Sequence, residues 1–421
     1  MKRLAVQYRS MPPVTQLLLL NQLTINLGFY MLMPYLAQHL AGTLGLAAWL
    51  VGLVLGVRNL SQQGMFAVGG ALADRFGYKP LIVAGCVLRT AGFGLLALAD
   101  SLPGLIIALA ATGLAGALFN PAVRAYLAVD AGPKRVEAFA LFNVFYQTGI
   151  LAGPLVGLAL TGINFRLTCA VAAAVFAILA VIQIRALPPQ RSIDKDPRES
   201  LMAQWRSVVA NRPFLLFASA MVCSYVLSFQ VYLALPLEVR RLPGDGADET
   251  FVVAALFAVS GLVTVLGQTR VTAWCRAHLQ SGQVLVLGTA TMGCAFVPLA
   301  LAAVVPQPTR NPGQWLIIVL PPLTAAAMLA VGTMIAFPFE MDTIVELSEG
   351  RLVATHYGIY NTICGFGITA GNLLTGAALD AARSAPVLPW LVLIALGLLS
   401  AGMLSVLQRK GRLSRTNATV S

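Results

Sequence analysis

Apolar runs of about twenty residues, separated by short polar breaks, follow one another along almost the whole 421-residue chain. A helix of about twenty apolar residues is long enough to cross the hydrocarbon core of a bilayer. The runs predict twelve membrane-spanning helices, at residues 14–38, 47–72, 80–99, 104–128, 138–160, 166–186, 214–237, 250–272, 282–304, 314–337, 354–379 and 387–408. We expect an all-α membrane protein with both termini on one side, because the number of spans is even.

The composition supports a membrane environment. Hydrophobic residues make up 58% of the chain and charged residues 10%, and the mean hydropathy is +0.80. Soluble domains carry about 25% charged residues, so a water-soluble fold of this composition would expose too much apolar surface. The lipid bilayer is therefore an expected partner, and the chain length sets the number of spans.

Most of the 28 Lys and Arg residues fall in the two tails and in the loops on the same side of the membrane as the tails. The loops on the other side hold five: Arg166, Arg240, Arg241, Arg310 and Arg383. Because basic residues resist translocation, we expect both termini in the cytoplasm and the chain in the plasma (inner) membrane. The same distribution accounts for the net charge of +12, so we expect no nucleic-acid partner.

The longest polar stretch, Leu187 to Arg212, lies between the sixth and seventh spans. It predicts an N-terminal six-helix bundle at 1–186, a cytoplasmic linker at 187–213, and a C-terminal six-helix bundle with a short cytoplasmic tail at 214–421. The two bundles also resemble one another. A shift of 218 residues lays Phe119 on Phe337, Asn143 on Asn361, Gly149 on Gly367 and Gly153 on Gly371. Such pseudo-symmetric halves place a substrate site near the midplane between them.

The linker itself contains a predicted helix. Asp196-Pro197-Arg198-Glu199 is typical of a helix start, with a capping acid, a proline in the first turn and a reciprocal acid. The apolar residues that follow predict one face of a short amphipathic helix at the inner interface: Leu201, Met202, Trp205, Val208 and Val209. The alternative is a disordered loop.

Spans two and three are joined by Gly70-Ala71-Leu72-Ala73-Asp74-Arg75-Phe76-Gly77-Tyr78-Lys79. Glycines allow close helix packing and a tight turn, and the Asp can accept hydrogen bonds from the positive N-terminus of a neighbouring helix. This segment resembles the signature loop of the major facilitator superfamily, G-x-x-x-D-R-x-G followed by basic residues, and it lies at the expected place. An ordinary cytoplasmic turn is the alternative.

The resemblance implies the roles of the loop residues. Gly70, Asp74, Arg75, Gly77 and Lys79 would form a conformational latch, in which Asp74 contacts the start of span eleven near Thr355 and His356 and stabilises the outward-open state. Arg75 would pair with Asp130. The resemblance also implies the fold, with twelve transmembrane helices in two pseudo-symmetric six-helix bundles.

Span five contains Gly149, Gly153, Pro154 and Gly157, a spacing that lets helices approach closely. It is similar to the antiporter motif of drug:proton exporters, although Ala140 replaces the upstream glycine, and plain helix packing is the alternative. The whole chain resembles the MdtH-type branch of the twelve-span drug:proton antiporters, in runs such as Leu27-Gly28-Phe29 and Leu88-Arg89-Thr90-Ala91-Gly92-Phe93. That resemblance implies multidrug export.

Three arginines fall inside spans: Arg58, Arg89 and Arg124. The acids of the first six spans, Asp74, Asp100, Asp130 and Glu137, all lie at span ends or in loops. A buried charge is costly and is a functional hypothesis by default, although each arginine has a structural alternative, and Arg124 can snorkel. The candidate cavity residues are Asn21, Asn26, Tyr30, Asn120, Arg124, Tyr225, Gln230 and Tyr232, with Arg58 and Arg89 as charge partners.

Proton coupling needs a group that titrates as access alternates. The first span has no carboxylate, and Leu109 stands at the usual basic position of span four. The remaining candidates are Glu340, Asp342, Glu238, Asp380 and His356. For Glu340 and Asp342, solvated loop acids are the alternative.

These features predict a secondary transporter that exports small amphipathic or lipophilic compounds by proton-driven alternating access. A transporter of an anionic metabolite or lipid, and a receptor or scaffold that has lost transport, are the alternatives. We expect no enzyme, cofactor or metal, because the chain shows no catalytic constellation or nucleotide loop and its six cysteines lack ligand spacing. A small-molecule substrate, protons and a monomeric state are expected.

Overall fold

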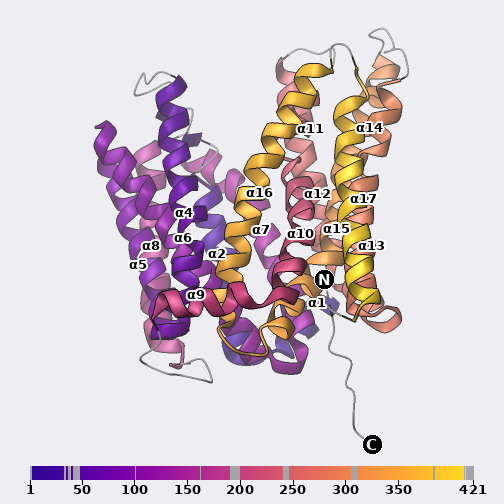
Figure 1. Cartoon of the computed structure of the whole chain (residues 1–421). Helices are drawn as coiled ribbons and strands as arrows, with labels where there is room; N and C mark the ends of the chain where they lie inside the picture. The colour runs from indigo at the N-terminus through magenta and orange to yellow at the C-terminus, as the bar shows by residue number, and fades with distance from the viewer. Residues whose placement is uncertain are drawn as a thin grey trace, which may run out of the picture. The chain divides into compact units, whose positions relative to one another are not determined.

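The computed structural model describes residues 2–32, 35–36, 39–40, 48–99, 101–161, 163–189, 200–239, 246–304, 312–382, 385–411 and 413. Within these ranges the chain is helical and has no strand. The helices, shown in Figure 1, are α1 (Lys2–Arg9), α2 (Pro13–Tyr30), α4 (Ala48–Phe76), α5 (Tyr78–Leu98), α6 (Leu102–Ala131), α7 (Arg135–Thr161), α8 (Phe165–Ala186), α9 (Leu201–Ala210), α10 (Arg212–Phe229), α11 (Ala234–Val239), α12 (Gly246–His278), α13 (Ser281–Cys294), α14 (Val297–Ala302), α15 (Pro312–Leu347), α16 (Val353–Ala381) and α17 (Leu388–Arg409).

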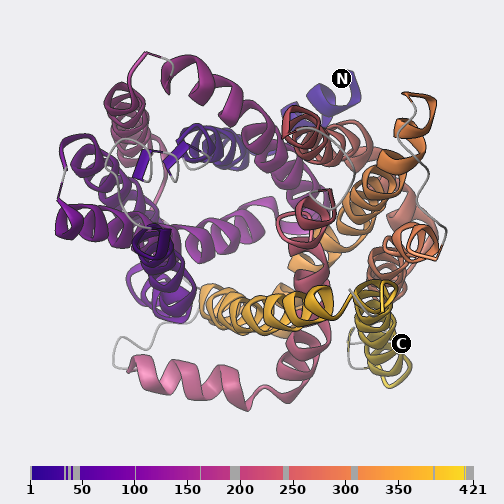
Figure 2. The ribbon, with the colours of Figure 1, turned by 90° about the horizontal axis from the view of Figure 1, so that it is seen from above.

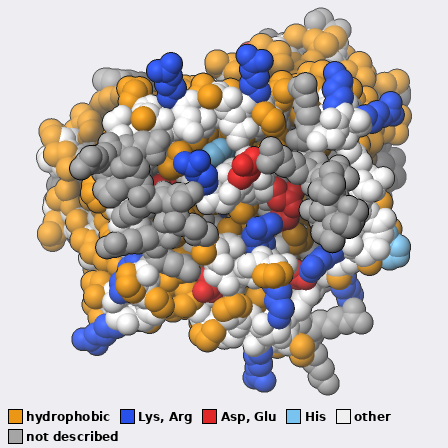
Figure 3. Space-filling model, turned by 60° about the horizontal axis from the view of Figure 1, so that its bottom comes forward, with side chains coloured by type: hydrophobic (Ala, Val, Ile, Leu, Met, Phe, Trp, Pro, Cys, Tyr) orange, Lys and Arg blue, Asp and Glu red, His pale blue; other side chains and the backbone are white. Residues whose placement is uncertain are grey.

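Every predicted span contains helix within the residues that the structure describes. In the described part of the chain, nine helical stretches are long and apolar enough to cross a membrane, one of which, Leu102–Leu160, joins α6 and α7. Helices α2 and α4 are not among them, because polar residues such as Asn21 and Arg58 interrupt their apolar runs. Apolar side chains cover the flanks of the molecule in Figure 3, while Lys and Arg side chains stand out on the face that comes forward there. The chain is an all-α, multi-pass membrane protein.

The chain divides into two compact units. Residues 2–212 and 344–362 form the N-terminal unit, and residues 213–343 with 363–421 form the C-terminal unit. The start of α16 therefore groups with the first half of the sequence, although the rest of that helix groups with the second half. The predicted bundle boundaries at 186 and 214 stay predictions.

Close helix pairs build the N-terminal unit: α4 and α5 pack along α6, α5 packs along α8, and α2 packs along α7 (Figure 2). Glycines make these approaches possible. A Cβ atom on Gly69 would collide with the backbone of Ala117, and one on Gly85 would lie 2.9 Å from the Cβ of Phe119. The helices are thus held by backbone proximity and dispersion contacts, which is how helices associate where lipid removes the hydrophobic drive.

The C-terminal unit contains two broken spans. The predicted single span at 214–237 is α10, a turn at residues 230–233, and α11, and the span at 282–304 is α13, a turn, and α14. A proline lies in the first turn of each resumed helix, Pro236 in α11 and Pro298 in α14, and a proline cannot donate the hydrogen bond that would continue the preceding helix. Each of these two spans is therefore interrupted by a turn, and each still forms one stretch long enough to cross a membrane.

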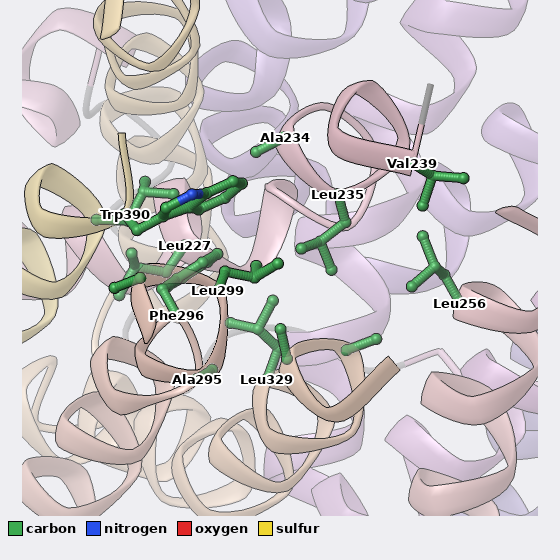
Figure 4. Close-up of a cluster of buried hydrophobic side chains, with 14 of the residues drawn as sticks. Leu227, Ala234, Leu235, Val239, Leu256, Ala295, Phe296, Leu299, Leu329 and Trp390 are labelled. Atoms are coloured by element: carbon green, nitrogen blue, oxygen red, sulfur yellow. The ribbon is translucent and has the colours of Figure 1, made fainter. Parts of the chain in front are cut away.

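Both breaks are packed into the core of the C-terminal unit (Figure 4). Leu235 follows the first break and Phe296 lies in the second, and both belong to one buried apolar cluster. The ring of Phe296 stacks on that of Trp390, with centroids 6.4 Å apart. These breaks are therefore buried features of the packing.

Helix α9 confirms that the linker contains a helix between residues 201 and 210. Its predicted start at 196–199 lies outside the described residues, and the N-cap is Ser200, whose Oγ accepts from the N–H of Ala203 at 3.2 Å. The predicted single apolar face is divided: Val208 is buried, but Met202 and Val209 are 68% and 52% exposed. The buried side faces α4, because Trp205 donates from Nε1 to the carbonyl of Ala67 at 3.1 Å.

Candidate functional site

Asp74 lies at the C-terminal end of α4, where the resemblance places it, and contacts the first turn of α16. The Thr355 N–H and Oγ1–H each donate to Asp74 Oδ2 at 2.7 Å, and the Ala354 N–H donates to Oδ1 at 3.3 Å. These are the second and third residues of α16, whose N–H groups have no partner within the helix. The preceding residue, Leu352, has a positive φ of 49° and no side-chain acceptor. Asp74 therefore acts as the N-terminal cap that α16 lacks.

The environment of Asp74 affects its ionisation. The side chain is 2% exposed and lies past residue 72, where the predicted span ends. Burial raises the pKa of the Asp74 carboxyl to about 6, and hydrogen bonds from Thr355, Ala354 and Tyr78 oppose that rise. The cap thus holds a carboxyl that titrates close to neutral pH.

Backbone contacts hold α4 and α16 together on either side of this cap. A Cβ atom on Gly70 would collide with the carbonyl oxygen of Ala354, and one on Gly358 would collide with that of Phe66. The glycines are therefore reciprocal, one on each helix. Any side chain at either position would separate the helices that Asp74 joins.

The other loop residues have different tasks. Gly77 ends α4 with a φ of 97°, a conformation that favours glycine, and its N–H donates to Ala73. Lys79 Nζ donates to the carbonyl of Ile184 at 2.7 Å, in the last turn of α8, where a cation is favourable. The exposed Arg75 lies over the ring of Phe76, with its guanidinium carbon 5.6 Å from the centroid.

The predicted pairing of Arg75 with Asp130 is wrong. Asp130 Oδ2 accepts from the N–H of Thr15 at 2.9 Å and from its Oγ1–H at 2.7 Å. Helix α2 begins at Pro13 after Pro12, and neither proline offers a side-chain cap. Asp130 supplies that cap instead, because unpaired N–H groups at a helix start attract a carboxylate at least as strongly as an exposed arginine does.

Helix α9 extends this group of contacts. Asn211, at its C-terminal end, donates from Nδ2 to the carbonyl of Leu347 at 2.8 Å and lies 3.4 Å from His356 Nε2. The other ring nitrogen of His356, Nδ1, lies 2.9 Å from the carbonyl oxygen of Leu352. His356 is 5% exposed, so this proton-coupling candidate is a packed residue of the first turn of α16.

The glycines of the antiporter-like motif face α2. A Cβ atom on Gly149 would lie 2.7 Å from Asn26 Cβ, one on Gly153 would lie 2.7 Å from Tyr30 Cβ, and one on Gly157 would collide with the backbone of Met31. Pro154 contributes a carbonyl that accepts from the Tyr35 hydroxyl at 2.6 Å. The motif therefore makes the close α2–α7 contact that plain helix packing would also produce. Its role in antiport stays a prediction.

Arg58 and Arg89 lie in the interior of the N-terminal unit. Arg58 is half-buried and donates to Asn59 Oδ1 at 2.8 Å and to Gln62 Oε1 at 2.7 Å. Arg89 is 6% exposed, and its guanidinium carbon lies over two aromatic rings, 5.3 and 5.5 Å from their centroids. Arg124 differs, because it donates to Asn361 Oδ1 at 3.0 Å.

The other cavity candidates of the N-terminal unit are engaged between its helices. Asn21 Oδ1 accepts from Gln183 Nε2 of α8 at 2.8 Å, and Asn26 donates to the backbone of its own helix. Tyr30 and Asn120 are half-buried. Tyr30 hydrogen-bonds Tyr146 of α7, a half-buried residue that the sequence analysis missed.

In the C-terminal unit, Tyr225 of α10 donates to Glu340 Oε1 at 2.9 Å. Glu340 and Asp342 are 4% and 7% exposed, because α15 continues to Leu347, ten residues past the predicted end of the span. The alternative of solvated loop acids is therefore wrong for both residues.

The remaining candidates of this unit are more dispersed. Gln230, at the break after α10, is fully buried and donates to the Val226 carbonyl at 2.8 Å and to Asn372 Oδ1 at 3.4 Å. Tyr232 is 47% exposed and packs on two phenylalanine rings. Glu238 is half-buried in α11, and Asp380 is exposed.

The sequence analysis also missed Thr15 and Asn211. The only signal for Thr15 was its place two residues after a Pro-Pro pair, which is typical of a helix start. Among the residues that the structure describes, no group of three or more His, Cys, Asp or Glu side chains is arranged to hold a metal ion.

Comparison with known proteins identifies the family that the sequence matches. The sequence matches the family model of the Major Facilitator Superfamily over residues 18–372. It is 54% identical over 376 residues to an uncharacterized MFS-type transporter of Mycobacterium tuberculosis strain H37Rv, covering 89% of this chain and 88% of the relative. It is also 30% and 29% identical to the multidrug resistance proteins MdtH of Yersinia enterocolitica, over 91% of each chain, and of Cronobacter sakazakii, over 90% of each chain.

Proposed function

Because the chain belongs to the major facilitator superfamily, we propose that it exports small amphipathic or lipophilic compounds from the cell by proton-coupled alternating access. The family and the transporter names of the relatives indicate a membrane transporter of a small molecule and not an enzyme. Export of drug-like compounds is supported by the similarity to proteins named for multidrug resistance. The distribution of Lys and Arg supports a plasma-membrane location with both termini in the cytoplasm.

The observation that carries the proposal is the hydrogen bond between the buried Glu340 and the half-buried Tyr225. A carboxyl in the interior of a membrane protein is costly when charged, and its protonation depends on whether water or a polar partner reaches it. Glu340 is 4% exposed and is held by a hydroxyl from α10, a different span. Opening the site to one side of the membrane admits water and favours loss of the proton, and closure favours its return. Glu340 is therefore the proposed proton carrier.

The Asp74 cap supports the alternating part of the proposal. It joins α4, which lies in the first half of the sequence, to the first turn of α16 in the second half. A contact made in one state and broken in the other biases the equilibrium between the two. We propose that this cap latches one of the two access states, and that substrate and protons shift the balance through their different affinities for each state.

The test uses inverted membrane vesicles with an imposed pH gradient, in which an exporter accumulates its substrate inside. The probes are a panel of lipophilic dyes of either charge, with ethidium as the cation and a naphthalenesulfonate as the anion. A pH-sensitive dye records proton movement in the same vesicles. We expect dye accumulation that an uncoupler abolishes, with proton efflux from the vesicle lumen in step with dye entry.

Matched acid variants locate the coupling site. Glu340→Gln mimics the protonated state, so it should abolish accumulation driven by the gradient while retaining exchange of labelled for unlabelled dye. Asp380→Asn changes an exposed acid of the same unit and should leave both activities intact. Gradient-driven accumulation by Glu340→Gln at the wild-type rate, or accumulation that no uncoupler affects, would contradict the proposal.

A further inference from the structure

Two guanidinium groups in the interior of the N-terminal unit have donors that no described acceptor satisfies. Arg89 Nη1 is buried without a hydrogen-bond partner, and so is Arg58 Nε. Arg89 is also 6% exposed, so its charge is almost wholly removed from solvent. Burying a charged donor without a partner is strongly unfavourable, and such groups usually face a ligand or a partner charge.

The described acids of the first six spans lie at helix ends. Asp74 caps α16 and Asp130 caps α2, each at a helix end. Glu137 lies in the first turn of α7, about two and a half turns before the level of Tyr146. No carboxylate among the described residues forms an ion pair with Arg58 or Arg89. The described side chains of the unit therefore do not neutralise the positive charge in this interior.

The two arginines are linked through α6. Gln62 Oε1 accepts from Arg58 Nη2 at 2.7 Å. A Cβ atom on Gly116 of α6 would lie 3.0 Å from the Gln62 side-chain amide and 3.4 Å from Arg89 Nη2. The amide and the second guanidinium therefore approach the same bare point on α6, and Gly116 is the residue type that leaves it bare.

Aromatic rings contact both guanidinium groups and accept none of their conventional hydrogen bonds. The Phe29 ring lies 4.4 Å from the guanidinium carbon of Arg58, and the Phe119 and Phe176 rings lie 5.3 and 5.5 Å from that of Arg89. Stacking on a ring uses the face of the guanidinium, and hydrogen bonds use its edge. The free donors, Arg89 Nη1 and Arg58 Nε, are charged N–H groups of the kind that binds a carboxylate, sulfonate or phosphate.

We propose that Arg89 binds the anionic group of the transported compound, with Arg58, held by Gln62, as the second positive charge. The inference rests on the proposed function and narrows its substrate class to amphipathic organic anions: an apolar body with a carboxylate, sulfonate or phosphate. The same head-group chemistry occurs in soluble compounds and in anionic lipids, and the experiment separates the two.

The test measures binding to the purified full-length protein without a proton gradient. Thermal unfolding is followed with a thiol-reactive dye, which reports the exposure of buried cysteines such as Cys86 and Cys169. The probes are naphthaleneacetate, naphthalenesulfonate and phenyl phosphate, each beside a neutral counterpart of the same shape, such as naphthaleneacetamide. At least one anion should raise the Tm, and its neutral counterpart should not.

Variants assign the effect to the site. Arg89→Gln should lose the difference between anion and neutral probe, and Arg89→Lys should keep part of it, because lysine retains the charge but not the fork. Arg185→Gln removes an exposed charge of the same unit and should behave as wild type. If Arg89→Gln does not fold, the comparison of the wild type with Arg89→Lys still tests whether the anion effect depends on the Arg89 guanidinium. No anion-specific shift in the wild type, or an undiminished shift in Arg89→Gln, overturns the inference.

A second arm identifies the source of the anion. Phosphatidylglycerol added to the detergent micelles is compared with phosphatidylcholine, and an Arg89-dependent rise in Tm with the former alone indicates a lipid head group. Failure of the two proposals is distinguishable. Binding without gradient-driven transport would support this inference and contradict proton coupling. Transport without anion-specific binding would contradict this inference and support proton coupling.

Discussion

Asp74 and Asp130 cap two helices with the same chemistry. Each lies near the end of its own helix, and one oxygen of each accepts from both the N–H and the hydroxyl of a threonine, the third residue of the capped helix. Their surroundings differ. Asp74 is 2% exposed and reinforced by the glycine contacts between α4 and α16, whereas Asp130 is half-buried beside α2.

The difference lies in what each cap joins. Helices α2 and α6 belong wholly to the N-terminal unit, so the Asp130 cap is internal to that unit. Helix α16 begins in the N-terminal unit and continues in the C-terminal unit, so the Asp74 cap holds a helix that both units share. The same type of cap would then stabilise one unit at Asp130 and, as proposed above, bias the balance between access states at Asp74. The following predictions separate these two roles.

Asp74→Asn should give the largest effect. An amide keeps the shape but loses the negative charge that the start of α16 attracts, and hydrogen bonds to a charged acceptor contribute about 1.5–3 kcal/mol. Transport in inverted vesicles, normalised to folded protein, should fall by roughly tenfold or more. Unchanged transport would contradict a latch, and a retained cellular phenotype without transport would favour a receptor or scaffold.

Gly358→Ala should rank second. The added Cβ collides with the backbone of Phe66, and overpacking of this kind costs about 1–3 kcal/mol. We expect transport to fall several-fold, because the substitution separates the same two helices without removing the carboxylate. Gly402→Ala in α17 is the matched control, since a Cβ there meets nothing within 4 Å. Equal behaviour of the two variants would show that close packing of α4 on α16 is not required.

Asp130→Asn should act mainly on stability. Loss of a helix cap costs about 0.5–2 kcal/mol, so the Tm should fall by a few degrees. Transport per folded molecule should stay near that of the wild type, because this cap joins elements of one unit. A loss of transport as large as that of Asp74→Asn would erase the distinction between the two caps.

Arg75→Ala should have the smallest effect. Its side chain is exposed and contacts Phe76, and substitutions at such surface positions usually change stability by about 0.5 kcal/mol or less. Uptake should remain within about twofold of the wild type. A strong defect would indicate that Arg75 pairs with an acid in another access state.

The positions of the spans could be predicted because a single requirement, burial of the backbone in apolar helices, determines them. The breaks at Gln230 and near Phe296 could not be predicted. A proline in an apolar run can either kink the helix or end it, and tertiary packing decides between the two. The place of Asp74 followed from a motif whose residues and topology agree. The partner of Asp130 could not be predicted, because the sequence does not reveal which helix start lacks a cap of its own.

The burial and hydrogen-bond partners of the interior polar side chains could not be predicted from the sequence either. The pattern identified Arg58 and Arg89 as charges inside spans, but only the structure shows which of their donors lack acceptors. In the same way, the sequence did not distinguish a buried Glu340 from a solvated loop acid, because the structure alone shows that α15 continues past this residue. Burial and pairing depend on helix length and rotation, which hydropathy does not encode.

The indole of Trp205 donates its proton to the Ala67 carbonyl, one helical turn before Gly70 on α4. Indole fluorescence is sensitive to whether that proton is bonded to peptide or to water. The chain thus carries an intrinsic optical reporter beside the α4–α16 junction. Emission from Trp205, isolated by replacing the other four tryptophans with phenylalanine, would follow the opening of that junction in real time without an attached dye.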